Sequence, residues 1–146
     1  MAAVNVSAQT EILAEPTDVA SVMFDPEREP EWISAVTSVE LVDRAIKPGA
    51  RVRRTGRVAG RDMTWTTAVE SFHFPHALTL RVMEGPIEGT ISYVIQRSAA
   101  GGSTVRIQTR GEASVLGSLP AALVEGPIRA TLEGDLGRLK QLVEKR

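Results

Sequence analysis

The sequence predicts an α+β fold in which a curved antiparallel sheet of six to seven strands wraps around a long C-terminal helix. Three observations support this prediction. Apolar and polar residues alternate over most of the chain between Val4 and Thr109, which is the period of half-buried strands. A break after the first strand leaves room for two short helices. Beyond residue 120 the apolar residues recur at helical intervals instead.

The first strand and the two short helices come at the start of the chain. Alternation from Val4 to Ile12 predicts the first strand. Glu15–Thr17 interrupts it, and Pro16 or Thr17 is well placed to begin a helix that ends at Asp25–Pro26. A second brief helix or turn is predicted over Pro30–Ala35, where Trp32 can pack beneath the first.

The middle of the chain is predicted to be a run of consecutive strands joined by tight turns. The turns are marked by Gly and Pro at Lys47–Gly49, Gly60–Asp62 and Pro75–His76, and by the hairpin loop Ala99–Ser103. The strands are predicted around Val39–Leu41, Ala50–Ala59, Met63–Ser71, Leu78–Val82, Ile91–Ile95 and Val105–Thr109.

The C-terminal segment is predicted to be an amphipathic helix. Its apolar residues lie three to five positions apart: Leu123, Ile128, Leu132, Leu136, Leu139 and Val143. Gly126–Pro127 interrupts it near the start, so the regular helix is predicted to run from Pro127 to Glu144. One helix cannot fill the hollow of so long a meander. We therefore expect a largely apolar cavity, and ligand sites of this kind measure roughly 300 to 1,000 Å³.

Composition narrows the class of protein. The 146 residues, with 17 basic against 18 acidic side chains and a net charge of -1, fit a single domain over residues 1–146 with no nucleic-acid partner. The absence of cysteine excludes disulfides and thiolate chemistry and favours the cytoplasm. No export signal, membrane span or glycine-rich phosphate motif is visible, so no cofactor is predicted. The oligomeric state stays open, with a homodimer as one option.

Several short motifs resemble one known family. Ile12-Leu13-Ala14-Glu15-Pro16-Thr17-Asp18-Val19, followed by Phe24-Asp25-Pro26 and Trp32-Ile33, resembles the opening of the START-like superfamily (SRPBCC, helix-grip fold) of polyketide cyclases, dehydrases and lipid-transport proteins. The beginnings of later strands agree, at Pro48–Val52, Val69–Phe72, Gly89–Tyr93 and Gly102–Val105. The resemblance spans nearly the whole chain and implies a ligand-holding cavity. It implies no particular reaction, because the superfamily shares no catalytic motif.

Arg54 is the most informative candidate site residue. If Trp65, Thr67 and Val69 face the hollow of the sheet, strand parity puts Val52 and Arg54 on the same face. A buried guanidinium needs a carboxylate or an anionic ligand group beside it. The alternative is that a bulge or the strand edge turns Arg54 to solvent. Arg51, Arg53, Arg57 and Arg61 are expected on the solvated outer face.

Glu84 and Tyr93 are the other candidates for proton chemistry. Glu84 shares parity with Leu80 and could point inward toward Arg54, or the turn at Gly85–Pro86 could leave it at the solvated rim. Tyr93 could hold a ligand carbonyl, or it could keep its ring in the core and its hydroxyl at the surface.

The remaining candidates would shape the cavity wall. Trp32, Trp65, Leu80 and Ile107 are predicted as apolar wall residues, and Thr67 and Thr109 as weak hydrogen-bonding groups, although each could equally be ordinary core. The complete predicted set of ligand-binding residues is therefore Trp32, Arg54, Trp65, Thr67, Leu80, Tyr93, Ile107 and Thr109. His73 and His76 are expected to be surface residues rather than metal ligands, and no metal site is predicted.

Three functions compete at this point. The first is a binding or carrier protein for a small hydrophobic molecule such as a lipid or polyketide. The second is a polyketide cyclase or dehydratase in which Arg54 anchors the substrate and Tyr93 or Glu84 moves a proton. The third is a toxin-like or regulatory interaction protein that uses the exposed arginines. The sequence does not identify the ligand.

Overall fold

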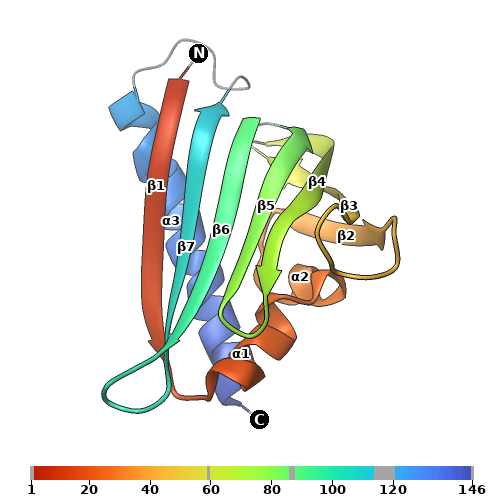
Figure 1. Ribbon diagram of the computed structural model, residues 1–146. Coiled ribbons are helices and arrows are strands. Elements are labelled where there is room, and N and C mark those ends of the chain that lie inside the picture. The colour runs from red at the N-terminus through yellow and green to blue at the C-terminus, as the bar shows by residue number, and fades with distance from the viewer. Residues whose placement is uncertain (1, 59, 86–87, 114–120, 146) are drawn as a thin grey trace.

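A single antiparallel sheet dominates the computed structural model, which describes residues 2–58, 60–85, 88–113 and 121–145. Its seven strands lie in the order β1-β7-β6-β5-β4-β3-β2, so neighbours in space are mostly neighbours in sequence (Figure 1). The strands are β1 (Ala2–Ile12), β2 (Val36–Leu41), β3 (Arg51–Val58), β4 (Arg61–His73), β5 (Ala77–Glu84), β6 (Glu88–Arg97) and β7 (Ser103–Ala113). The predicted strand end at Ala59 and the turn residue Pro86 lie outside the described residues.

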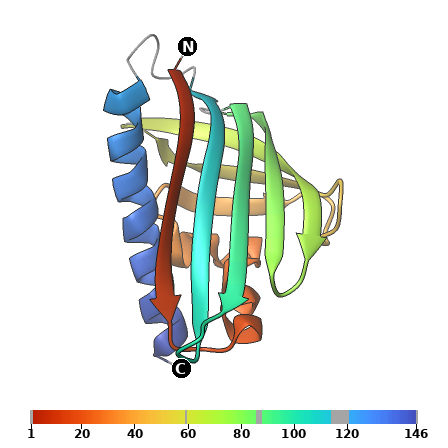
Figure 2. The same cartoon turned by 60° about the vertical axis from the view of Figure 1, so that its left-hand side comes forward.

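The long C-terminal helix α3 (Ala121–Glu144) lies against the hollow side of this sheet. It runs alongside β1, while the strands at the other end of the sheet bend round to the opposite side of the hollow (Figure 2). Leu136, Leu139 and Val143 on α3 pack into the core with residues from every strand except β2 and β3. The predicted α+β fold, a curved sheet gripping one helix, is thus confirmed.

The connection between β1 and β2 carries the short helices. They are α1 (Pro16–Met23), the 3-10 turn η1 (Pro26–Arg28) and α2 (Glu29–Trp32). Proline stands in the first turn of each, where its missing N–H leaves no bond unmade. The Asp25 side chain caps η1 by accepting a hydrogen bond from the Glu27 amide at 3.1 Å. The second short helix spans Glu29–Trp32 and a turn follows at Ser34–Ala35, so the helix or turn predicted over Pro30–Ala35 begins one residue earlier than expected.

The strand that carries Arg54 alternates cleanly. In β3 the even-numbered residues Val52, Arg54 and Gly56 are buried and the odd-numbered arginines are exposed, as parity predicts. Gly56 permits a close approach of the chain before β2, because a Cβ there would lie 1.7 Å from the Ala35 carbonyl oxygen. This contact brings β2 and the end of α2 close to the hollow face.

Two side chains depart from the direction that simple periodicity gives them. A register shift between Val69 and Ser71 breaks the alternation of β4, so that Phe72 packs against the core beside Phe24. On α3, the predicted core residue Leu123 is 63% exposed and its neighbour Val124 is buried. The helix also begins earlier than predicted, at Ala121, and continues through Pro127. Pro127 has no N–H to donate to the carbonyl of Leu123, four residues earlier. The helix tolerates this loss because Leu123 faces solvent.

Candidate functional site

A cavity of about 130 Å³ lies between the sheet, α2 and the middle of α3. Its wall is mostly apolar but includes one arginine and two carboxylates. The lining residues are Glu29, Trp32, Ile33, Val36, Arg54, Trp65, Thr67, Leu80, Ile91, Tyr93, Ile107, Thr109, Leu132 and Asp135. The volume is below the expected range of roughly 300 to 1,000 Å³, because α2 and its aromatic side chain close one side of the hollow.

A buried ion pair crosses the cavity wall. Arg54 is 4% exposed, and its Nε and one terminal nitrogen donate to the two carboxylate oxygens of Glu29 at 2.5 and 2.8 Å. Its other terminal nitrogen donates to the Thr67 hydroxyl at 2.6 Å. This fork geometry is the strongest way to neutralise a buried guanidinium. Burial acts to lower the pKa of Arg54, but the hydrogen bond and charge of Glu29 outweigh it and hold that pKa above its ordinary value.

Of the two alternatives for Glu84, the structure shows the solvated rim position and no contact with Arg54. Glu84 is exposed at the end of β5 and does not line the cavity, and its place is taken by Glu29, the first residue of α2. The alternative in which Arg54 turns to solvent is also excluded, because no bulge interrupts β3 at that position. A carboxylate from the short helix therefore compensates a cation from the sheet.

Tyr93 stands near this pair on β6. It is 5% exposed, and its ring packs edge-on against Trp32 with ring centroids 6.0 Å apart. Burial raises the pKa of its hydroxyl, and the nearby Glu29 carboxylate raises that pKa further. The hydroxyl consequently stays protonated at all physiological pH values, so it can donate a hydrogen bond but cannot act as a base. The alternative with the Tyr93 hydroxyl at the surface does not hold.

Asp135 on α3 ties the helix to α2 at the edge of the cavity. Its carboxylate accepts hydrogen bonds from the Ser34 amide at 3.1 Å and from the Arg138 guanidinium. Arg138 in turn donates from Nε to the Trp32 carbonyl oxygen at 3.0 Å. Burial raises the pKa of Asp135, while these partners act to lower it. The network fixes the main chain from the Trp32 carbonyl to the Ser34 amide.

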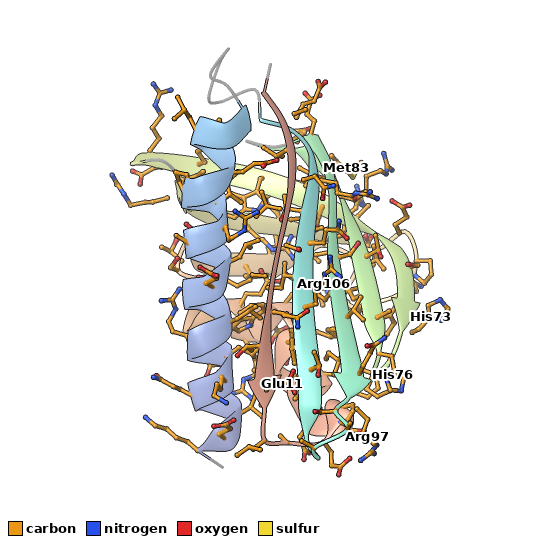
Figure 3. All side chains as sticks on the ribbon, turned by 90° about the vertical axis from the view of Figure 1, so that its left-hand side faces the viewer. Glu11, His73, His76, Met83, Arg97 and Arg106 are labelled. Carbon is orange, nitrogen blue, oxygen red and sulfur yellow. The ribbon has the colours of Figure 1, made fainter. Side chains whose placement is uncertain are left out.

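All eight predicted ligand-binding residues line this one cavity: Trp32, Arg54, Trp65, Thr67, Leu80, Tyr93, Ile107 and Thr109. Their binding of a ligand remains a prediction. Neither His73 nor His76 is near: both are exposed at the turn after β4, on the side of the sheet away from α3 (Figure 3). Among the described residues no cluster of three metal-binding side chains occurs.

The outer-face arginines of β3 are exposed as predicted. Three of them form ion pairs with neighbouring carboxylates: Arg51 with Asp43, Arg53 with Glu40 and Arg57 with Asp62. Because these charges are already compensated locally, the strand offers little net positive charge to a macromolecular partner. The interaction-protein hypothesis therefore gains no support from them.

Sequence reasoning missed two polar residues of the cavity, Glu29 and Asp135. Glu29 lies in the acidic and proline-rich stretch Glu27–Glu31, where nothing separates it from its solvated neighbours. Its only signal was indirect: an inward-facing Arg54 demands a carboxylate. Asp135 could have been suspected from its helical position, since it lies three residues after Leu132 and immediately before Leu136 on the apolar side of the predicted helix.

This architecture, a curved seven-stranded sheet holding a C-terminal helix over a mostly apolar cavity, defines a helix-grip protein. The model of the family "Polyketide cyclase / dehydrase and lipid transport" matches residues 3–144. The chain belongs to that family.

Solved structures share the fold across nearly the whole chain. A START superfamily protein from Mycobacterium smegmatis is 19% identical, with a TM-score of 0.83 and 97% of each chain covered. A protein from Thermus thermophilus is 22% identical, with a TM-score of 0.78 and coverage of 96% of this chain and 97% of the other. The di-domain ARO/CYC protein of the BE-7585A biosynthetic pathway is 17% identical, with a TM-score of 0.74, and 97% of this chain covers 46% of it. At these identities the likeness shows the fold alone.

Two further comparisons are brief. No curated protein matches the chain. Among the described helices, none combines the length and the apolar character needed to cross a membrane.

Proposed function

We propose that this protein binds a small hydrophobic molecule in the cavity between the sheet and α3, as a carrier or binding protein. The observation that carries the proposal is the cavity itself, whose wall combines Leu80, Ile107 and Leu132 with a few fixed polar groups. Ligand sites commonly have this composition, in which apolar surface supplies affinity and a few polar groups set orientation. Family membership supports the same proposal.

Native mass spectrometry of the protein purified from its own host tests the proposal. We expect a retained molecule of low polarity whose signal is lost from the variant Leu132→Trp, in which the larger side chain fills the cavity from α3. Leu142→Trp, also half-buried on α3 but outside the cavity wall, is the matched control and should retain the molecule. Retention of the same molecule by Leu132→Trp would contradict binding at this place.

A second function, that of a cyclase or dehydratase acting on such a ligand, is favoured by Tyr93. Its protonated hydroxyl lies on the cavity wall, where it can donate to a ligand carbonyl as negative charge develops on the oxygen. Arg54 contributes no free positive charge to this reaction, because Glu29 already neutralises it. Arg54 can assist only as a hydrogen-bond donor. Glu84 has no part in the mechanism.

The enzymatic hypothesis is tested with the molecule recovered by mass spectrometry as substrate. Tyr93→Phe should lower turnover about 100-fold or more while leaving binding within a few-fold, as removal of a proton donor does. Equal turnover by Tyr93→Phe and the unmodified protein would rule out this role, and the carrier function would stand alone.

A further inference from the structure

The cavity wall includes a side chain whose hydrogen-bond donor is satisfied by no described protein group. Trp32 is 1% exposed and lines the cavity, and its indole Nε1 has no hydrogen-bond partner among the described residues. It is also the sole buried side-chain nitrogen or oxygen of those residues in this state. An unsatisfied buried donor costs about 1 to 3 kcal/mol, which a guest could recover by supplying an acceptor.

The position of this indole is well fixed. The carbonyl of Trp32 accepts from Arg138 on α3, the adjoining Ile33 amide donates to the Glu29 carbonyl at 2.8 Å, and the ring packs against Tyr93. Because these three contacts already restrict Trp32, its side chain loses little further conformational entropy when it donates a hydrogen bond to a guest. Such preorganisation favours binding.

The charged groups of the wall are already paired. Glu29 compensates Arg54, and Arg138 compensates Asp135. An anionic guest would face two carboxylates, and a cationic guest would have to compete with two arginines for them. Either ion would lose its hydration without gaining a free counter-charge, which is costly in an apolar cavity. The wall therefore selects an uncharged guest.

The volume limits the buried part of the guest. An apolar cavity of roughly 150 Å³ holds one benzene molecule, and this cavity measures about 130 Å³. About one six-membered ring fits between Leu80, Ile107 and Leu132 without rearrangement.

From these observations we propose that the guest is a small uncharged compound that buries about one ring and carries a carbonyl or ether oxygen, which accepts a hydrogen bond from Trp32 Nε1. This inference rests on the proposed binding function and adds the chemical class of the guest. It also gives Trp32 a specificity-determining role that its aromatic packing alone would not require.

Titration calorimetry with four single-ring probes tests the inference. The probes are acetophenone, ethylbenzene, benzoate and benzylamine, which share a ring but differ in having a neutral acceptor, no acceptor, a negative charge and a positive charge. The measured quantity is the affinity ratio of acetophenone to ethylbenzene, in the unmodified protein and in Trp32→Phe. Hydration differences between the two probes cancel in this comparison. Phe74→Leu, altered at an exposed aromatic residue that does not line the cavity, is the control.

We expect the acetophenone to ethylbenzene ratio to fall about three- to tenfold in Trp32→Phe, the effect of one neutral hydrogen bond, and to be unchanged in Phe74→Leu. Benzoate and benzylamine should bind at least about tenfold more weakly than acetophenone, since neither ion finds a free counter-charge. The inference would be overturned if the acetophenone to ethylbenzene ratio were equal in Trp32→Phe and the unmodified protein, or if a charged probe bound as tightly as acetophenone. In either case, binding of ethylbenzene would still support the proposed function. If none of the four probes binds, both fall.

Discussion

At the scale of single residues, the pair of Arg54 and Glu29 determines the polar character of the cavity. Both side chains are almost completely buried, with 5% and 3% of their surfaces exposed. Two such charges are tolerable only together, because each supplies the hydrogen bonds that the other has lost to desolvation. The pair also joins α2 to β3, which are 25 residues apart in the chain.

Removing one partner of this pair should be far more harmful than removing both. Glu29→Met leaves a buried guanidinium without a counter-charge, and we expect it to lower the free energy of unfolding by about 3 to 5 kcal/mol. The double variant Glu29→Met, Arg54→Met should recover most of that loss. Urea denaturation followed by circular dichroism measures both.

The exposed pair of Arg53 and Glu40 is the matched control on the neighbouring positions of β3 and β2. Glu40→Met should change the free energy of unfolding by less than about 1 kcal/mol, as is usual for solvated ion pairs. Additive losses in the Glu29 and Arg54 double variant would show that the two side chains do not stabilise one another.

Strand parity was sufficient to place Arg54 and six of the other predicted wall residues around one cavity, and Trp32 joins them from α2. It could not identify Glu29 as the counter-charge. A side chain on a strand has a direction fixed by its neighbours, but a carboxylate in a short turn of helix has a direction set by the whole fold. Parity therefore offered only Glu84 as a possible carboxylate, and Glu84 lies at the solvated rim, the other alternative left open for it.

At the scale of elements, the end of α3 is fastened to the end of β1. Glu144 accepts a hydrogen bond from the Leu13 amide at 2.8 Å and one from Lys140, also at 2.8 Å. Lys140 donates in addition to the Glu11 carbonyl oxygen at 2.6 Å. The last turn of the helix is thereby held against the strand that flanks it over its whole length (Figure 2).

This contact should make stability depend on pH in the acid range. The Leu13 amide and Lys140 hold the pKa of Glu144 below its ordinary value of 4.5. The contribution of Glu144 is therefore complete above that value and is lost as the pH falls through the lower folded-state pKa. We expect Glu144→Gln to flatten the decline in melting temperature below pH 4.5, measured by thermal denaturation.

Glu133→Gln, on the same helix, serves as the control and should leave the acid decline unchanged. If Glu144→Gln and the unmodified protein lose melting temperature in parallel as the pH falls, the contact between α3 and β1 does not depend on the ionised carboxylate.

The approach of β3 to the segment before β2 depends on Gly56. A side chain there would collide with the Ala35 carbonyl, so Gly56→Ala should lower the free energy of unfolding by about 1 to 3 kcal/mol, the usual cost of overpacking. Gly137→Ala is the matched control, because no atom lies within 4 Å of the added methyl group. In the helix interior it should stabilise the protein by roughly 0.5 to 1 kcal/mol. Equal denaturation midpoints for Gly56→Ala and the unmodified protein would refute the close contact.

The elements themselves could be predicted because their periodicity is a local property. The strands and the long helix follow from alternation and helical spacing, as β3 and the Leu136–Val143 part of α3 illustrate. The register shift after Val69 could not be predicted, since the two strands that share it have no local signal for an unpaired residue. The start of α3 at Ala121 could not be predicted either. Proline is common in the first turn of a helix, so Pro127 indicated a helix start at that point.

At the scale of the whole molecule, a hollow sheet covered by one helix explains why a cavity exists, but not how large it is. The fold class and the existence of the cavity followed from the number of strands and the single long helix. The cavity volume depends on the rotamers with which Trp32, Tyr93 and Leu132 pack, and the sequence pattern does not predict rotamers. The cavity is consequently smaller than expected.

The central claim is that this cavity takes up a small apolar guest, and methyl NMR during an ethylbenzene titration tests it most directly. We predict saturable shifts at the methyl groups of Leu80, Ile107 and Leu132, which surround the cavity, and none at exposed Leu13. In Leu132→Trp, the same titration should cause no shift at the methyl groups of Leu80 and Ile107. Shifts that do not saturate, or that persist in the filled variant, would contradict the claim.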